Sequence, residues 1–257
     1  MLKALMLKAL TFDLDDTLWD NAGVMLTTEQ GHVDWLTENL AEWQRARGEP
    51  VTPAIALDVY QRERVALGKR TWERRGDFSW LRERTLITLL EASGLNTAAA
   101  RLWAALAMDR FHSLRTQVTP FPSTDAMLER LRPHYRLGTI TNGNVAFHRL
   151  PLRRYFDACI AAGEMFAPKP DPRPFLAMLA RLGVSPGQAL HVGDSWEEDV
   201  LPALRLGMRA AWIAPATTPV PEGPNTHNGV LPAGVVRLER VTELEALLAD
   251  TPRSPRQ

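Results

Sequence analysis

An acidic run near the N-terminus is the first place where the residue types could perform chemistry. Directly after the apolar pair Ala9-Leu10 comes the run Thr11-Phe12-Asp13-Leu14-Asp15-Asp16-Thr17. Side chains two residues apart on an extended strand point to the same side, so Asp13 and Asp15 can face one pocket. Carboxylate oxygens are preferred ligands of Mg²⁺, and a carboxyl group can exchange a proton with a leaving oxygen. We therefore interpret Asp13 as a candidate metal ligand and Asp15 as a candidate acid and base.

Polar residues later in the chain could complete this chemistry. They are Thr141, Asn142 and Gly143, then Lys169, then Asp194 with Asp199 close behind. Phosphoryl transfer needs an in-line nucleophile, cations over the phosphoryl oxygens and help for the leaving group. Lys169 and the Thr141 hydroxyl suit the phosphoryl oxygens, whereas Asp194 could share a Mg²⁺ ion with Asp13. Together, these carboxylate, hydroxyl and ammonium groups favour a magnesium-dependent site for a small phosphate ester.

The positions of these residues depend on the strands that precede them. Short apolar, β-favouring runs predict buried strands, and amphipathic runs between them predict helices. The expected strands are 9–12, 137–140, 158–161, 189–192, 210–213 and 235–238, and helices lie near 127–131, 175–182, 200–206 and 242–248. This alternation favours a mostly parallel, Rossmann-like α/β sheet, in which ligands bind at the carboxyl ends of the strands. The polar residues should therefore meet at one edge.

The stretch from residue 19 to residue 118 has a different pattern. It predicts amphipathic helices near 33–43, 57–65, 80–90 and 102–111, with no convincing strand between them. We therefore predict a discontinuous catalytic core of residues 1–18 and 119–257 with an inserted helical domain, residues 19–118, that covers the site. The stretch 215–234 reads as a loop, and the tail 251–257 is expected to fray.

The composition bears on partners and location. Lys plus Arg and Asp plus Glu are each 30, so no excess charge indicates nucleic acid or an anionic membrane as a partner. The first ten residues are too short for a signal peptide, and no apolar stretch is long enough to span a bilayer. The single cysteine, Cys159, excludes an intrachain disulfide. We expect a soluble, cytoplasmic monomer or homodimer.

Four motifs together resemble those of the haloacid dehalogenase-like (HAD) hydrolases. In chain order they are residues 12–18 around Asp13, Ile140-Thr141-Asn142-Gly143, Lys169-Pro170, and Val192-Gly193-Asp194-Ser195 followed by Asp199. Each motif alone is unspecific, because an acidic cluster before Thr is usually a turn or a helix cap. Their joint occurrence in this order makes coincidence a poor explanation. The spacing is similar to that of the subgroup with a cap between the first two motifs, so the resemblance implies an HAD core with an α-helical cap.

The resemblance implies a role for each acidic residue. Asp13 would be the nucleophile and a metal ligand. Asp15 would be the acid and base, with its backbone carbonyl also on the metal. Asp194 would bind Mg²⁺ directly, and Asp199 would support the metal ligands without binding the ion. The true dehalogenases of this superfamily lack the second acid, so Asp15 favours a phosphatase.

The resemblance also implies how the substrate is bound. Lys169, a catalytic residue as well, would contact the phosphate together with Thr141, Asn142 and Gly143. A closer similarity is to the bacterial flavin-pathway phosphatases that act on FMN and on 5-amino-6-(5-phosphoribitylamino)uracil, carried by the runs 18–21, 141–144 and 190–194. It implies a role in riboflavin biosynthesis. Sugar phosphates and nucleotides are the alternative substrates.

Other interpretations remain open at this point. A phospho-acceptor switch also uses an acidic cluster, a Thr or Ser and a Lys at strand ends. A catalytically inactive member of the superfamily, a phosphomutase or a dehalogenase would share the same fold. Trp19 and Trp80 are candidates for stacking on a flat substrate. His191, inside an apolar strand, is predicted to pack in the core and not to take part in catalysis.

Overall fold

The computed structural model describes residues 7–222 and 229–249. They divide into two units: a core unit of residues 7–20, 119–143, 150–222 and 229–249, and a helical unit of residues 21–118 and 144–149. The tail 251–257 and part of the expected loop, 223–228, lie outside the described residues. The remainder of that loop contains turns and bends only.

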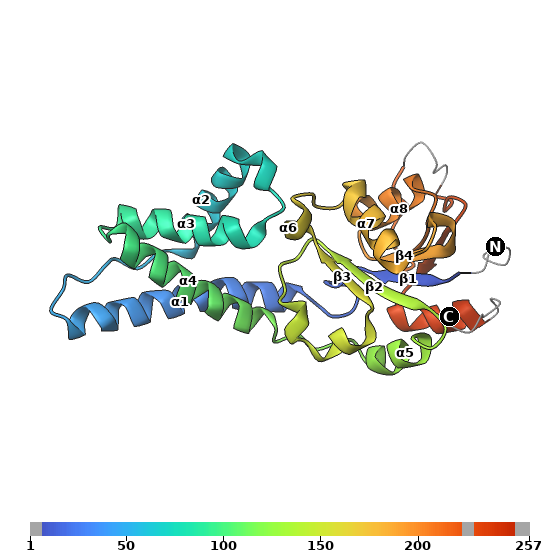
Figure 1. The fold of residues 1–257 in the computed structure, drawn as a ribbon, viewed down its shortest axis with the longest axis horizontal. Coiled ribbons are helices and arrows are strands. Elements are labelled where there is room, and N and C mark those ends of the chain that lie inside the picture. The colour runs from blue at the N-terminus through green and yellow to red at the C-terminus, as the bar shows by residue number, and fades with distance from the viewer. Residues whose placement is uncertain (1–6, 223–228, 250–257) are drawn as a thin grey trace. The chain divides into compact units, whose positions relative to one another are not determined.

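Six parallel strands form the sheet of the core unit (Figure 1). They are β1 (Ala9–Phe12), β2 (Arg136–Thr141), β3 (Ala158–Ala161), β4 (Ala189–Gly193), β5 (Arg209–Ile213) and β6 (Val235–Leu238). Their order is β3-β2-β1-β4-β5-β6, so the direction of winding reverses beside β1. Open α/β sheets bind ligands at such a switch point. The predicted strands and the Rossmann-like fold are confirmed.

Helices of the core unit lie between these strands in the chain, and one more follows the last strand. They are α5 (Thr124–Leu131), α6 (Ala162–Met165), α7 (Pro172–Leu182), α8 (Leu201–Arg205) and α9 (Leu244–Ala249). In α7 the start and stop are local: the Asp171 side chain accepts a hydrogen bond from the Arg173 N–H, Pro172 occupies the first turn, and Gly183 follows at φ +61°. The apolar face of α7 packs into the core cluster through Phe175, Met178, Leu179 and Leu182.

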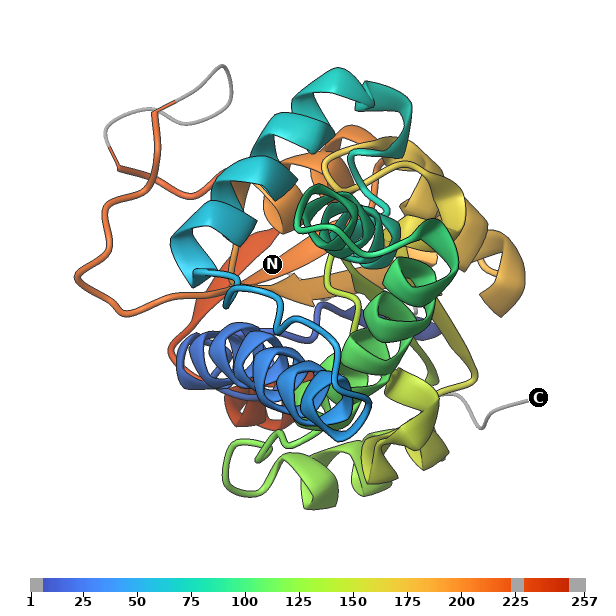
Figure 2. The same ribbon diagram turned by 90° about the vertical axis from the view of Figure 1, so that its left-hand side faces the viewer.

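Four long helices make up most of the helical unit. They are α1 (Ala22–Ala46), α2 (Leu57–Arg70), α3 (Phe78–Ala92) and α4 (Thr97–Arg115), and Figures 1 and 2 show α1 and α4 running side by side. Side chains cap two of the starts, because Asp77 accepts from the Trp80 N–H and Asn96 from the Ala99 N–H. Among helices of the described residues, none is long and apolar enough to cross a membrane.

Helix α1 begins well before the predicted start at residue 33. The early part contains Gly23 and Gly31 and lacks a clear apolar period, so local propensity disfavours a helix there. Gly31 lies against α4, where an added Cβ would come within 2.9 Å of the Leu114 side chain. Close packing of α1 on α4 therefore stabilises these turns, which sequence periodicity did not indicate.

Residues 144–149 belong to the helical unit, although the prediction assigned them to the core. The side chain of Asn144 donates to the Ser79 hydroxyl at 3.2 Å, and Arg149 lies 3.9 Å from Asp109. Both partners are on helices of the inserted segment, α3 and α4. The grouping of this loop therefore depends on long-range contacts rather than on its place in the chain.

Candidate active site

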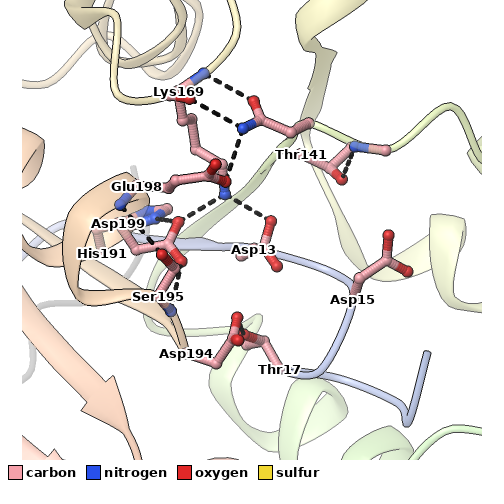
Figure 3. A network of polar contacts seen from close by, with 12 residues as sticks. Asp13, Asp15, Thr17, Thr141, Lys169, His191, Asp194, Ser195, Glu198 and Asp199 are labelled. Atoms are coloured by element: carbon pink, nitrogen blue, oxygen red, sulfur yellow. Dashed lines mark hydrogen bonds and ion pairs between the residues drawn. The ribbon is translucent and has the colours of Figure 1, made fainter. Parts of the chain in front are cut away.

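The carboxyl ends of β1, β2 and β4 bring the predicted polar residues together. Asp13 follows β1, and its N–H continues the ladder by donating to the carbonyl of Val192 at 2.8 Å. Thr141 is the last residue of β2, and Asp194 follows the last residue of β4. Because the three strands are neighbours in the sheet, residues from distant parts of the sequence meet at one edge (Figure 3).

Lys169 links two carboxylates in this group. Its Nζ donates to Oδ1 of Asp13 and to Oδ1 of Asp199, each at 2.6 Å, and its side chain is 2% exposed. Asn142 holds the main chain of Lys169 from both sides: Oδ1 accepts from the Lys169 N–H at 2.7 Å, and Nδ2 donates to the Lys169 carbonyl at 3.0 Å. Nδ2 also donates to Glu198 at 2.8 Å. The Asn142 amide thus fixes the loop that carries the ammonium group.

Asp199 is held through both of its carboxylate oxygens. Oδ1 accepts from Lys169 and lies 3.0 Å from Nε2 of His191, and Oδ2 accepts from the Ser195 N–H at 3.1 Å. One turn of π-helix, Trp196–Val200, precedes α8 and positions this side chain. Such turns are often found at functional sites. A Cβ at Gly193 would overlap the Asp199 carboxyl group, so the close approach requires glycine there.

Burial and the neighbouring charges have opposing effects on the pKa values of several of these groups. Burial raises the pKa of Asp13, and the Lys169 charge opposes the shift. Burial disfavours the charged forms of Lys169 and Asp199, but their mutual attraction outweighs it. The pKa of Lys169 is therefore raised by Asp13 and Asp199, and the pKa of Asp199 is lowered to about 2. Burial, with the Asp199 charge, raises the pKa of Asp194 to about 6.

Three carboxylates lie close enough to share a cation. Asp13, Asp194 and Asp199 each offer a ligand atom within 4.8 Å of the others. An all-oxygen donor set fits a hard ion such as Mg²⁺, and the raised pKa of Asp194 is the expected effect of burying a carboxylate beside others. Asp199 already accepts from Lys169 and Ser195, whereas the carboxylate of Asp194 lies at a longer distance, 3.4 Å, from the Thr17 hydroxyl that donates to it. The donor set fits the metal, with Asp13 and Asp194 as the better candidate ligands.

Asp15 lies beside this group and is held by a different residue. Figure 3 shows Asp15 apart from the hydrogen bonds that join Asp13, Lys169 and Asp199. Its Oδ1 accepts a 2.8 Å hydrogen bond from the indole Nε1 of Trp19, which is fully buried. With no exposed face, Trp19 does not offer the stacking surface that we predicted; it contacts the candidate acid and base instead.

The family assignment rests on a match that covers most of the chain. Residues 7–207 match the model of the family described as haloacid dehalogenase-like hydrolase. The chain belongs to the haloacid dehalogenase-like hydrolases. Within this HAD family it is similar to 5-amino-6-(5-phospho-D-ribitylamino)uracil phosphatase YigB of Escherichia coli (strain K12), with 32% identity over 81% of this chain and 84% of the relative.

Two further HAD relatives cover nearly the whole chain. A glyceraldehyde 3-phosphate phosphatase of Methanothermobacter thermautotrophicus is 27% identical over 95% of this chain and 100% of its own. The crystal structure of a 2-haloacid dehalogenase from Pseudomonas syringae pv. Tomato DC3000 has a TM-score of 0.81 and 34% identity, covering 95% of this chain and 99% of that one. The predicted HAD fold and the assignment to an HAD hydrolase with phosphatase relatives are confirmed.

The structure brings the predicted HAD motif residues to one place but leaves their roles as proposals. Thr141 and Gly143 lie together, since the Thr141 hydroxyl oxygen accepts from the Gly143 N–H at 2.9 Å. Asn142, predicted to bind substrate, has both ends of its amide bonded to other residues of this HAD core. Its contact with a substrate stays a prediction.

Sequence reasoning missed the position of His191 in this HAD site. The residue is buried, as predicted, but both of its ring nitrogens have partners: Nδ1 lies 2.8 Å from the Thr11 hydroxyl and Nε2 lies 3.0 Å from Asp199. A histidine in an apolar strand is usually a packed core residue. The only available signal was its place two residues before Gly193, on the strand that carries Asp194.

Proposed function

We propose that this HAD hydrolase is a magnesium-dependent phosphomonoesterase that forms an aspartyl-phosphate on Asp13. The observation that carries the proposal is the hydrogen bond of 2.6 Å from the Lys169 ammonium to the Asp13 carboxylate, at a strand end where Thr141 and Asp194 also lie. A carboxylate nucleophile with a cation beside it suits attack on a phosphoryl group, whose oxygens carry negative charge.

The proposed catalytic cycle has two steps, and the second returns Asp13 to its free form. First, a carboxylate oxygen of Asp13 bonds to phosphorus as the ester P–O bond breaks, and Asp15 gives a proton to the leaving alkoxide. Then the Asp15 carboxylate takes a proton from water, and the water oxygen attacks phosphorus, which releases phosphate and frees Asp13. Lys169 and the Thr141 hydroxyl bind the phosphoryl oxygens, and Asp199 keeps Lys169 in position.

Asp13, Asp194 and the backbone carbonyl of Asp15 are the groups that we assign to Mg²⁺. The bound ion supplies positive charge that offsets the repulsion between the carboxylates and an anionic substrate. The proximity of the three acidic side chains and the match of their oxygen atoms to a hard cation support this assignment. The donors on both oxygens of Asp199 support its role as a residue that orients the site without binding the ion.

The names of the relatives support the proposed substrate class. The Escherichia coli relative is named for 5-amino-6-(5-phospho-D-ribitylamino)uracil, so we propose that compound or FMN, both flavin-pathway phosphates, as the substrate. The archaeal relative is named for glyceraldehyde 3-phosphate, which makes a small sugar phosphate the alternative. We further propose that the helical segment, residues 19–118, serves as the cap that selects among them.

Phosphate release from a panel of esters tests the proposal. The purified protein should hydrolyse p-nitrophenyl phosphate with Mg²⁺ and lose activity with EDTA, and the best natural ester should come from the flavin-pathway pair. Asp13→Asn should abolish turnover, whereas Asp34→Asn, at an exposed helical position, should keep it. Turnover by Asp13→Asn would defeat the mechanism. Failure on both flavin-pathway compounds, with activity on others, would remove only the substrate assignment. Stoichiometric labelling without turnover would indicate a phospho-acceptor switch.

A dehalogenase is the second candidate, because the Pseudomonas syringae structure with that title is 34% identical. Halide is a weak base and leaves without a proton, so dehalogenation does not need a general acid such as Asp15. When a phosphate monoester reacts, the leaving group is an alkoxide, a strong base that does need a proton from an acid. Chloride release from 2-chloropropionate without Mg²⁺, together with no phosphate release from the panel of esters, would contradict the phosphatase proposal and favour a dehalogenase.

A further inference from the structure

His191 joins strand β1 to the acidic group of the site, and the role inferred for it rests on the proposed function. Thr11 and His191 are register partners on the neighbouring strands β1 and β4, so their side chains project from the same face of the sheet. The Thr11 hydroxyl lies 2.8 Å from Nδ1, and Nε2 lies 3.0 Å from Oδ1 of Asp199. All three residues are at most 1% exposed. A continuous buried path therefore runs from Thr11 through His191 and Asp199 to Lys169.

The hydrogen-bond inventory assigns the protons along this path. Asp199 is ionised beside the Lys169 ammonium and can only accept, so Nε2 of His191 must be the donor. Burial keeps the ring neutral by lowering its pKa, and a neutral imidazole carries one N–H. Nδ1 is then an acceptor, and the Thr11 hydroxyl donates to it. Each group is satisfied in only this arrangement.

Packing holds the ring in this orientation. The ring of Phe175, on α7, meets the imidazole at a centroid distance of 5.0 Å and an interplanar angle of 73°, an edge-to-face contact. Thr11 holds the opposite nitrogen from β1. The Nε2–H bond is therefore directed at Asp199 by the sheet itself and does not depend on a mobile loop.

We propose that His191 is a positioning residue for phosphoryl transfer: as the neutral Nε2–H tautomer it fixes Oδ1 of Asp199, which in turn holds the Lys169 ammonium against Asp13. The same oxygen, Oδ1, accepts from both His191 and Lys169. Without the imidazole donor the carboxylate can turn, and the ammonium loses the geometry that it needs in the transition state. Supporting residues of this kind typically contribute roughly 10- to 100-fold to activity.

A matched pair of substitutions tests the role. His191→Met has comparable volume and no donor, and should lower kcat roughly 10- to 100-fold while KM changes less than about threefold. His191→Gln places an amide N–H where Nε2 lies and should recover most of kcat. Thr11→Val, which removes the hydroxyl donor at constant shape, should lower kcat, whereas Thr11→Ser should not. A kcat for His191→Met within twofold of the parent would overturn the proposal.

The tautomer provides a readout that does not depend on activity. The ¹⁵N chemical shifts of the imidazole should identify a neutral Nε2–H ring at pH 7, and the signals absent from His191→Gln assign them among the six histidines. An Nδ1–H tautomer or an imidazolium would overturn the proposal even if the activity data agreed. If the parent protein releases no phosphate from any ester, the proposed function fails, while the tautomer result still stands as a separate test of the path.

Discussion

The indole N–H of Trp19 donates a hydrogen bond of 2.8 Å to Oδ1 of Asp15. An indole can donate but not accept, so this oxygen remains an acceptor in both protonation states of the carboxyl group. The proton that Asp15 gives to a leaving group must then reside on Oδ2. Trp19 therefore both orients the proposed acid and selects the oxygen that it uses.

Replacing Trp19 by Phe should weaken acid catalysis selectively. The parameter kcat/KM reports the steps up to release of the alcohol, so it isolates the protonation of the leaving group. We expect kcat/KM to fall roughly tenfold for an alkyl phosphate and much less for p-nitrophenyl phosphate, since nitrophenolate leaves with little protonation. Trp103→Phe is the matched control, because Trp103 is buried in the helical unit and its Nε1–H donates to none of the described residues. Equal losses for both substrates would contradict this role.

Gly193→Ala should disable the site with the fold intact. The added methyl would overlap the carboxyl group of Asp199, which is held on all sides by Lys169, His191 and Ser195. We expect kcat to fall about 100-fold, measured on protein whose circular dichroism is unchanged. Gly138→Ala is the control in the same sheet: its methyl would meet the flexible end of Met178, so it should cost about 1–3 kcal/mol of stability but leave kcat near the parent value. Full activity of Gly193→Ala would show that Asp199 can move freely.

The helical unit should lose stability as the pH falls from 6.5 to 4. Burial, reinforced by the nearby charge of Arg82, lowers the pKa of His32 to about 4. Between these values the unfolded chain binds a proton that the folded chain does not, so stability rises with pH and is lost on acidification. The full effect is about 3 kcal/mol. Amide hydrogen exchange in α1, corrected for intrinsic rates, measures the stability of the helical unit at each pH. The variant His32→Asn has no titrating side chain at this position, so its stability should depend less steeply on pH. Parallel curves would exclude His32 as the source.

Glu29→Gln should destabilise the helical unit far more than the loss of an exposed ion pair. Glu29 accepts from Arg64, Arg82 and Gln61, and the Arg82 side chain is only 6% exposed. Removing the carboxylate leaves a buried guanidinium without its counter-charge, which costs about 3 kcal/mol. Asp58→Asn breaks the exposed pair with Arg62 and should cost less than about 1 kcal/mol. Urea unfolding of both variants provides the comparison, and similar losses would contradict the importance of burial.

Local patterns account for the predicted part of the fold. Parallel strands are buried on both faces, so each has a short run of apolar residues in the sequence. The six strands, and the site residues at their ends, could therefore be predicted from the sequence. Asp13 after β1 and Asp194 after β4 could be assigned to one edge because parallel strands end on the same side. Helix starts were harder to predict from the sequence. Helix α1 begins at Ala22, because close packing at Gly31 outweighs the low helix propensity of its first turns.

The sequence by itself thus determined the fold class, the strand that carries the candidate nucleophile and the chemistry of its motif. Only the tertiary structure decided which side chains hold that motif in place. Thr11 and His191 are 180 residues apart, and Lys169 and Asp13 are 156 apart. Propensity and periodicity act over a few residues, whereas a hydrogen bond requires two atoms to be placed within fractions of an ångström. That placement comes from sheet register and packing, which the whole chain determines together.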